Sequence, residues 1–219
     1  MKKKIYLNAG HGGIHPITKK YCTFPTDGKF YTFAENGITA YEGQTNRIFA
    51  NLFGVAMIGT DIEIVQTHHN FWDRANQDRL ARANLDFTNT KPDKALWLSW
   101  HSNAVGMQST GKSLEPRGYS IYTSQGNTQA DDCATLIFNE QRKATAKFGV
   151  TFRQDLQDGQ PDYDINFEEL AYSKMPAVLI ENLFFTNYED YKLLLNSEYQ
   201  LATVQATKKA VLEWFNKVN

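Results

Sequence analysis

The sequence predicts an α/β fold in a single domain, with a mostly parallel central sheet of about six strands and helices on both faces. Apolar, strand-like runs alternate along the chain with segments of helical periodicity, which is the pattern of parallel α/β proteins. One α/β domain with long loops accommodates the 219 residues. The 42% hydrophobic and 13% aromatic content excludes a disordered chain. We therefore expect residues 1–219 to form one domain.

The strands and helices are predicted from the period of the apolar residues. The expected strands are Lys4–Asn8, Ile62–Thr67, Ala95–Trp100, Tyr119–Thr123, Val150–Phe152 and Ala177–Ile180. The expected helices are Glu42–Ala56, Arg74–Phe87, Thr128–Lys147 and two C-terminal helices that begin with the capping patterns Thr186-x-x-Glu189 and Ser197-x-x-Gln200, the last running to about Lys217.

The segment between Gly12 and Tyr41 is too long to be a simple connection. Tyr21–Phe24 and Lys29–Phe33 flank Pro25-Thr26-Asp27-Gly28, which predicts a hairpin around that turn. Its aromatic residues either form a platform for sugar rings or a peptide, or pack the hairpin onto its own domain. They are Tyr21, Phe24, Phe30, Tyr31 and Phe33, of which Tyr31 and Phe33 are our candidate substrate contacts.

The segment Arg153–Ser173 is a second candidate binding loop, and it is polar and acidic. Its carboxylates either meet an amine of a substrate or form a solvated loop face. They are Asp155, Asp158, Asp162, Asp164, Glu168 and Glu169.

Charge and cysteine content exclude several classes of protein. The 23 basic and 24 acidic residues leave a net charge of −1, which argues against a nucleic-acid binder and a polybasic membrane binder. No apolar run approaches the roughly 20 residues of a membrane span. Cys22 and Cys133 are too few for a disulfide scaffold. The basic start Met1–Lys4 precedes only three apolar residues, too few for a secretory signal peptide.

The residues that follow the strands carry the chemistry, because ligands of open α/β sheets bind beyond the carboxyl ends of the strands. His11, His101 and Glu181 each lie at or just after an expected strand, and Glu42 begins the first expected helix. Two His and one carboxylate are the ligand set of a catalytic zinc, and a second carboxylate is what such a site needs as a proton shuttle. The alternative is hydrogen-bonded His residues at strand ends, with surface or helix-start carboxylates.

Several spaced blocks of the sequence resemble those of the zinc-dependent N-acetylmuramoyl-L-alanine amidases of bacteria and phages, which cleave peptidoglycan. The blocks are residues 5–13, Glu42 with Asn46, residues 78–84, residues 98–104 and residues 176–187. The resemblance implies one zinc ion held by His11, Glu42 and His101, with Glu181 as the catalytic carboxylate. Asn103, in the fourth block, is a further candidate substrate contact. The implied reaction is hydrolysis of the amide between N-acetylmuramic acid and L-alanine.

The chain also departs from the family pattern. After the second strand the family usually has Thr-Arg, whereas this chain has His68-His69, which either face the cleft or form a solvated loop pair. The 14–41 region is longer than usual, and the 153–173 loop does not align clearly. His15 lies four residues after His11, but Gly12, Gly13 and Pro16 argue against a helix that would pair the two.

One sequence motif points to a different chemistry. Residues 106–113 fit the phosphate-loop pattern G-x-x-x-x-G-K-[ST], which needs a helix that starts at its Lys-Ser. Pro116 and Gly118 break a helix there, so we expect no nucleotide site.

Two alternatives to the amidase stay open: another zinc peptidase or hydrolase on the same scaffold, and a non-catalytic wall-binding module. The expected partner is peptidoglycan, with no nucleic acid, no integral membrane segment and a monomer assumed. We expect a protein that is made in the cytoplasm and acts on the cell wall, with phage-mediated release of an endolysin as one route.

Overall fold

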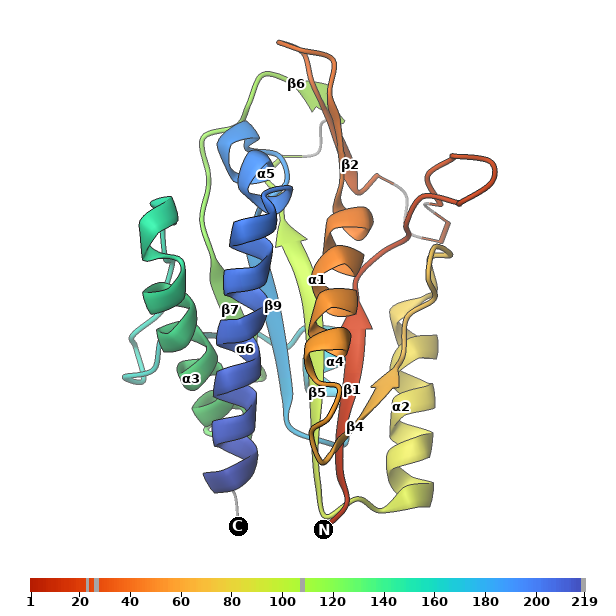
Figure 1. Ribbon diagram of the computed structural model, residues 1–219, viewed down its shortest axis with the longest axis vertical. Coiled ribbons are helices and arrows are strands. Elements are labelled where there is room, and N and C mark those ends of the chain that lie inside the picture. The colour runs from red at the N-terminus through yellow and green to blue at the C-terminus, as the bar shows by residue number, and fades with distance from the viewer. Residues whose placement is uncertain (23, 26–27, 107–108, 218–219) are drawn as a thin grey trace.

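The computed structural model describes residues 1–22, 24–25, 28–106 and 109–217, and it has three layers (Figure 1). A six-stranded sheet with the order β4-β1-β5-β9-β7-β8 lies between helices on both faces. Its strands are β1 (Lys3–Ala9), β4 (Ile62–Gln66), β5 (Lys94–Asn103), β7 (Ser120–Thr123), β8 (Tyr163–Asp164) and β9 (Ala177–Phe184). The predicted single-domain α/β class is confirmed.

Strand direction places the site residues at one edge of this sheet. β1 pairs in parallel with β4 and β5, and β5 pairs in parallel with β9. Only β7 and β9 are antiparallel among the neighbouring strands described, so the sheet is mostly parallel, as predicted. In the β5–β9 register His101 lies opposite Glu181. The carboxyl ends of β1, β5 and β9 therefore meet at one edge.

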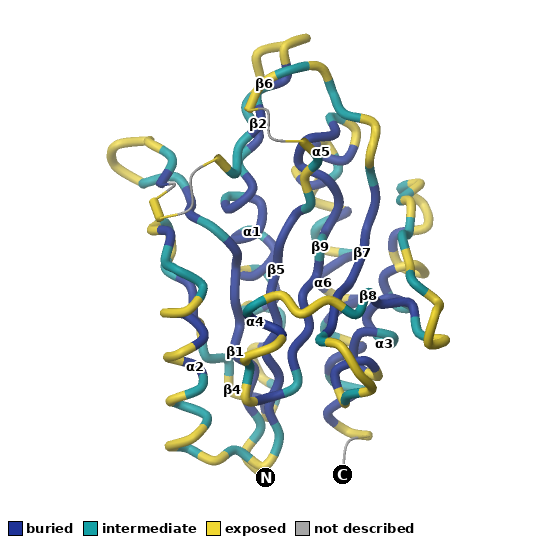
Figure 2. Tube along the Cα trace, turned by 180° about the vertical axis from the view of Figure 1, so that it is seen from behind, coloured by how far each residue is buried: buried dark blue, intermediate teal, exposed yellow. Residues whose placement is uncertain are grey.

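The helices cover the two faces unequally (Figures 1 and 2). One face carries α1 (Glu42–Ala56), α3 (Gln129–Ala144) and α6 (Ser197–Lys217), whereas α2 (Asn76–Thr90) and the short α4 (Glu168–Ala171) lie on the other. α5 (Tyr188–Leu194) precedes α6, and a short 3-10 turn, Ala146–Phe148, follows α3. Among the described helices, none has the length and apolar character to cross a membrane.

Two hydrophobic clusters follow from the alternation of side chains along the strands. Ile5, Leu7 and Ala9 face the larger cluster under α1, α3 and α6, while Tyr6 faces the smaller cluster, which α2 and the Leu170 side chain of α4 help to form. The same alternation puts Trp97 and His101 on the α2 and α4 side of β5. Figure 2 shows the central strands as the most buried part of the molecule.

One strand prediction and one helix start are wrong. Residues 150–152 form no strand, because only an isolated bridge joins Phe152 to Tyr119. The sixth strand is instead β8, inside the acidic 153–173 segment. The helix start at Thr186 is also wrong, since the side chain of Asn187 accepts the capping hydrogen bond from the Asp190 backbone.

The strand of the predicted hairpin that spans residues 30–33 has other partners than predicted. β2 (Phe30–Phe33) pairs antiparallel with β3 (Thr39–Tyr41) and parallel with β6 (Thr110–Gly111) in a second, three-stranded sheet. The chain reverses at Gly37, which has a φ of 71° and whose backbone N–H donates to the Phe33 carbonyl. Tyr21 bridges Ile14 instead of pairing with β2. Thr23, Thr26 and Asp27 of the predicted hairpin lie outside the described residues.

No helix follows the phosphate-loop match. In the described part of that motif, Thr110–Gly111 is the strand β6, and the next regular element along the chain is β7. Met107 and Gln108 lie outside the described residues. The helix N-terminus that a phosphate loop requires is therefore missing from this segment.

Candidate metal and catalytic site

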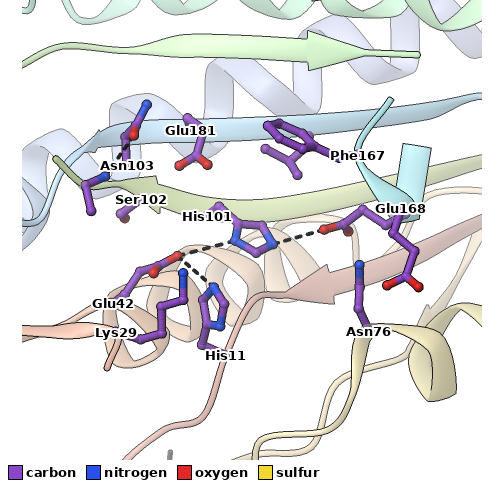
Figure 3. Close-up of a pocket in the computed structure, with 13 residues that line it drawn as sticks. His11, Lys29, Glu42, Asn76, His101, Ser102, Asn103, Phe167, Glu168 and Glu181 are labelled. Carbon is purple, nitrogen blue, oxygen red and sulfur yellow. Dashed lines mark hydrogen bonds and ion pairs between the residues drawn. The ribbon is translucent and has the colours of Figure 1, made fainter. Parts of the chain in front are cut away.

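The four residues predicted from the strand ends converge on one cavity (Figure 3). His11 follows β1, Glu42 is the first residue of α1, and His101 and Glu181 lie on β5 and β9. In Figure 3 the side chains of His11, Glu42 and His101 point toward one another, and the Glu181 carboxylate faces the same space. The structure thus brings these four side chains together in one cavity.

Two glycines allow the elements to approach so closely. A Cβ atom on Gly10 would lie 2.0 Å from Cε1 of His101, and one on Gly43 would lie 1.8 Å from the Gly12 carbonyl oxygen. His11 itself has a φ of 61°, an uncommon left-handed conformation for a residue with a side chain. Such backbone strain is typical of functional sites, where the surrounding structure holds it in place.

One carboxylate oxygen and two imidazole nitrogens form the candidate metal-binding group. Glu42 Oε1 lies 3.3 Å from His11 Nε2 and 3.3 Å from His101 Nδ1. Zinc bonds of about 2.0–2.1 Å at a tetrahedral angle give ligand atoms about 3.3 Å apart, so the group has the right size for this ion. Glu42 is only 3% exposed, and Asn46 donates a hydrogen bond to its Oε1.

The charges of the group also suit a cation. Burial lowers the pKa of His11 to about 3, so its imidazole is neutral and can offer a lone pair. Burial alone would raise the pKa of Glu42, but the two imidazoles lower it to about 2. Burial likewise opposes the charge on His101, yet Glu169 and Glu42 raise its pKa to about 10. A metal at Nδ1 of His101 must therefore displace a proton as it binds.

Glu181 has the properties of an acid–base group. Burial raises its pKa to about 8, with His101 opposing the shift and Glu42 adding to it. Its Oε2 is shielded from solvent and has no hydrogen-bond partner in the part of the chain that the structure describes. A carboxyl group with a pKa near neutrality can both accept and donate a proton at working pH.

Glu169 belongs to the site but was not predicted to. It is 3% exposed, and its Oε1 lies 3.2 Å from His101 Nε2. Its Oε2 accepts hydrogen bonds from Trp97 Nε1 and Asn8 Nδ2. The solvated-face interpretation of the acidic segment is thus wrong for Glu169, and also for the buried Asp162. The position of Glu169 directly before the apolar Leu170 was the only sequence signal for its burial.

Of the three candidate substrate contacts, one lines the cavity and two are buried in the core. Asn103 ends β5 and lines the cavity, so its contact with substrate stays a prediction. Tyr31 and Phe33 are fully buried, and the Tyr31 hydroxyl donates to the Lys112 carbonyl. These two residues pack β2 onto the domain, so their expected contact with substrate is corrected. Lys29, which was not predicted, lines the cavity beside Glu42.

The remaining His residues stabilise local structure. His15 Nδ1 accepts hydrogen bonds from the backbone of Ile17 and Thr18, and His69 Nδ1 accepts one from the Trp72 backbone. His68 is 7% exposed, and its Nε2 lies 2.8 Å from Gln66 Nε2. The expectation of a cleft-facing or solvated His68 is therefore wrong. None of these three belongs to a candidate metal-binding group among the described residues.

The fold and the site together define an α/β enzyme with a candidate metal centre beside an acid–base carboxylate. The family model described as N-acetylmuramoyl-L-alanine amidase matches residues 5–213. The chain therefore belongs to the N-acetylmuramoyl-L-alanine amidase family, as the spaced blocks predicted. No curated protein matches its sequence significantly.

Solved structures of such amidases share this fold. An N-acetylmuramoyl-L-alanine amidase from Clostridium difficile 630 superposes with a TM-score of 0.75 at 20% identity, over 100% of this chain and 99% of that one. The catalytic domain of CwlV from Bacillus (Paenibacillus) polymyxa var. colistinus has a TM-score of 0.67 at 20% identity, over 98% of both chains. The catalytic domain of the CD27L endolysin, which targets Clostridia difficile, has a TM-score of 0.59 at 19% identity, over 96% and 97% of the two chains.

Proposed function

We propose that this enzyme hydrolyses the amide between N-acetylmuramic acid and L-alanine in peptidoglycan, with one zinc ion held by His11, Glu42 and His101. The observation that carries the proposal is the pair of 3.3 Å distances from Glu42 Oε1 to the two imidazoles, beside the unpaired oxygen of Glu181. The family match supports the substrate class.

The chemistry follows from the charges of the site. When bound, zinc would lower the pKa of a water molecule to about 7 and polarise the carbonyl that is attacked. Glu181 would accept a proton from the attacking water at its carboxylate and pass that proton to the nitrogen of L-alanine. A carbon–oxygen bond then forms, the carbon–nitrogen bond breaks, and the amine leaves neutral.

The cavity also offers groups for orienting the substrate. Asn103 and Lys29 line it, and so does Asn76 from the start of α2. These side chains supply hydrogen-bond donors and one cation to a cavity that is otherwise rich in carboxylates. They would fix the substrate with its scissile amide beside Glu181.

For the biological role we propose lysis of the cell wall by a monomer that is made in the cytoplasm and reaches the wall after phage-mediated release. The similarity to the catalytic domain of an endolysin supports this role. Lysis of whole cells from outside and from within, with expression in the cytoplasm, would test it. Size-exclusion chromatography with light scattering would test the monomer.

The reaction is tested with purified protein and insoluble peptidoglycan. Newly released amino termini are labelled and identified, with no addition, with a zinc chelator, and with chelator followed by zinc. We expect L-alanine termini that the chelator abolishes and zinc restores. Termini of other residues would point to a peptidase, and wall binding without release would point to a binding module; either result contradicts the proposal.

A further inference from the structure

We infer that Glu169 is a positioning residue for the metal centre: it holds the His101 ring and keeps a proton on Nε2, so that Nδ1 is the ring nitrogen that binds the metal. The inference rests on the zinc site proposed above. It assigns a role to a buried carboxylate that comes from the acidic 153–173 loop, outside the four-residue site.

The two nitrogens of His101 face two different carboxylates. Nδ1 lies 3.3 Å from Glu42, within the metal-binding group, and Nε2 lies 3.2 Å from Glu169 on the opposite side of the ring. Figure 3 draws a dashed line from each of these ring nitrogens. A neutral imidazole has one N–H and one lone pair, so a metal at Nδ1 requires the proton on Nε2. An ionised carboxylate only accepts protons, so Glu169 favours a proton on Nε2. Glu42 likewise favours a proton on Nδ1 in the metal-free site, and a metal that binds Glu42 and Nδ1 displaces that proton.

Glu169 is itself held in place from its other side. Trp97 Nε1 donates to its Oε2 at 2.9 Å, and Asn8 Nδ2 donates at 3.1 Å. Asn8 is in turn fixed by Arg79, whose Nη1 donates to Asn8 Oδ1 at 2.9 Å. The carboxylate therefore links the metal-binding His of β5 to β1 and α2.

These donors make Glu169→Gln an informative change. The Trp97 and Asn8 N–H groups require an oxygen opposite them, so they would orient the glutamine with its amide oxygen on their side. Its NH₂ group would then face His101 Nε2, which must become an acceptor. A neutral imidazole would then keep its proton on Nδ1, and metal binding at Nδ1 would force a proton onto Nε2, where it faces the NH₂ group and has no acceptor. We expect zinc affinity to fall by about 10–100-fold, as for other carboxylates that orient metal-binding His residues.

Glu168→Gln is the matched control. Glu168 lies on the same short helix and lines the same cavity, but no hydrogen bond or ion pair to a metal-binding residue is found for it in the described structure. Both variants remove one negative charge near the site, so a purely electrostatic effect would lower zinc affinity in both. We expect Glu168→Gln to stay within about twofold of the wild type, because the screened charge does not touch His101.

The experiment measures zinc affinity of the full-length protein by competition with a chelator, together with ¹⁵N NMR of the His101 ring in the zinc-free state. We expect Nε2 to carry a proton in the wild type and to lack one in Glu169→Gln. Glu169→Asp keeps the charge on a shorter side chain, so it should lose less affinity than Glu169→Gln, and it serves if the Gln variant does not fold.

The outcomes separate the two proposals. A wild-type protein that does not bind zinc overturns the proposed metal centre and this inference together. Tight zinc binding by the wild type with an unchanged affinity and a protonated Nε2 in Glu169→Gln overturns the inference alone. Equal losses of zinc affinity in Glu168→Gln and Glu169→Gln would also overturn it, because they would indicate a general effect of charge. Equal losses of zinc affinity in Glu169→Asp and Glu169→Gln would overturn it as well, because they would indicate an effect of packing.

Discussion

Gly10→Ala is expected to disable the site while leaving the fold intact. The added Cβ would lie 2.0 Å from Cε1 and 2.4 Å from Nδ1 of the His101 ring. Restoring an ordinary contact of about 3.4 Å requires the ring to move by roughly 1.4 Å. Metal–ligand distances tolerate about 0.2 Å, so a displacement of this size removes His101 Nδ1 from the metal-binding group.

The change can be measured as zinc affinity and as release of L-alanine termini. We expect zinc affinity to fall as much as it would in a variant that lacks one of the three metal ligands. Activity should fall by at least about 100-fold, since a misplacement of 1 Å at a reacting centre costs that much. The zinc-free variant should still unfold cooperatively, because the His101 ring can turn into the cavity that it lines.

Gly54→Ala is the control for this prediction. Gly54 lies inside α1, where a Cβ would meet only Leu7 Cδ2 at 3.7 Å, an ordinary contact. We expect unchanged zinc affinity and a gain in stability of up to about 1 kcal/mol from the better helix former. A Gly10→Ala protein with wild-type zinc affinity and activity would refute the reasoning that this glycine sets the position of His101.

Three further changes test the acid–base group and the core. Glu181→Gln should keep zinc but lose about 10²–10⁴-fold in hydrolysis, and undiminished turnover would remove Glu181 from the mechanism. Burial raises the folded pKa of Glu181 to about 8 from an unfolded value of about 4.3, so its stabilising contribution is complete below the unfolded value and lost as pH rises through about 8. Urea unfolding of the zinc-free protein should therefore show that the free energy of unfolding falls more between pH 5 and pH 9 in the wild type than in Glu181→Gln. An equal fall in both proteins would contradict this. The Phe49 ring stacks on Trp100 with a distance of 5.5 Å between the ring centroids, and Phe49 is 1% exposed. Phe49→Ala should therefore lower the free energy of unfolding by about 3–5 kcal/mol, measured by thermal or urea unfolding. A decrease of less than about 1 kcal/mol would show that neighbouring side chains fill the space.

Local patterns were enough to predict the layers of the fold and to select four candidate site residues. The apolar period of residues 42–56 predicts α1 to the residue, and Thr128, the first residue of the predicted helix 128–147, is the N-cap of α3. His11, His101 and Glu181 could be selected because parallel strands bring their carboxyl ends to one edge. The helical period is visible within a short stretch of sequence, and the parallel sheet follows from the alternation of such stretches along the chain.

The tertiary structure alone decided which residues of the two long loops matter. β8 is only two residues long, and β2 pairs with β3 and β6 whereas Tyr21 bridges Ile14, because strand pairing depends on the partners that the rest of the fold presents. A carboxylate in an acidic loop is ordinarily solvated, and Glu169 is buried only because Trp97, Asn8 and His101, all distant in sequence, offset the cost of its desolvation. The fold class and the four candidate site residues follow from local sequence patterns, whereas the support of His101 by Glu169 depends on contacts between β1, β5 and α4 that no local pattern encodes.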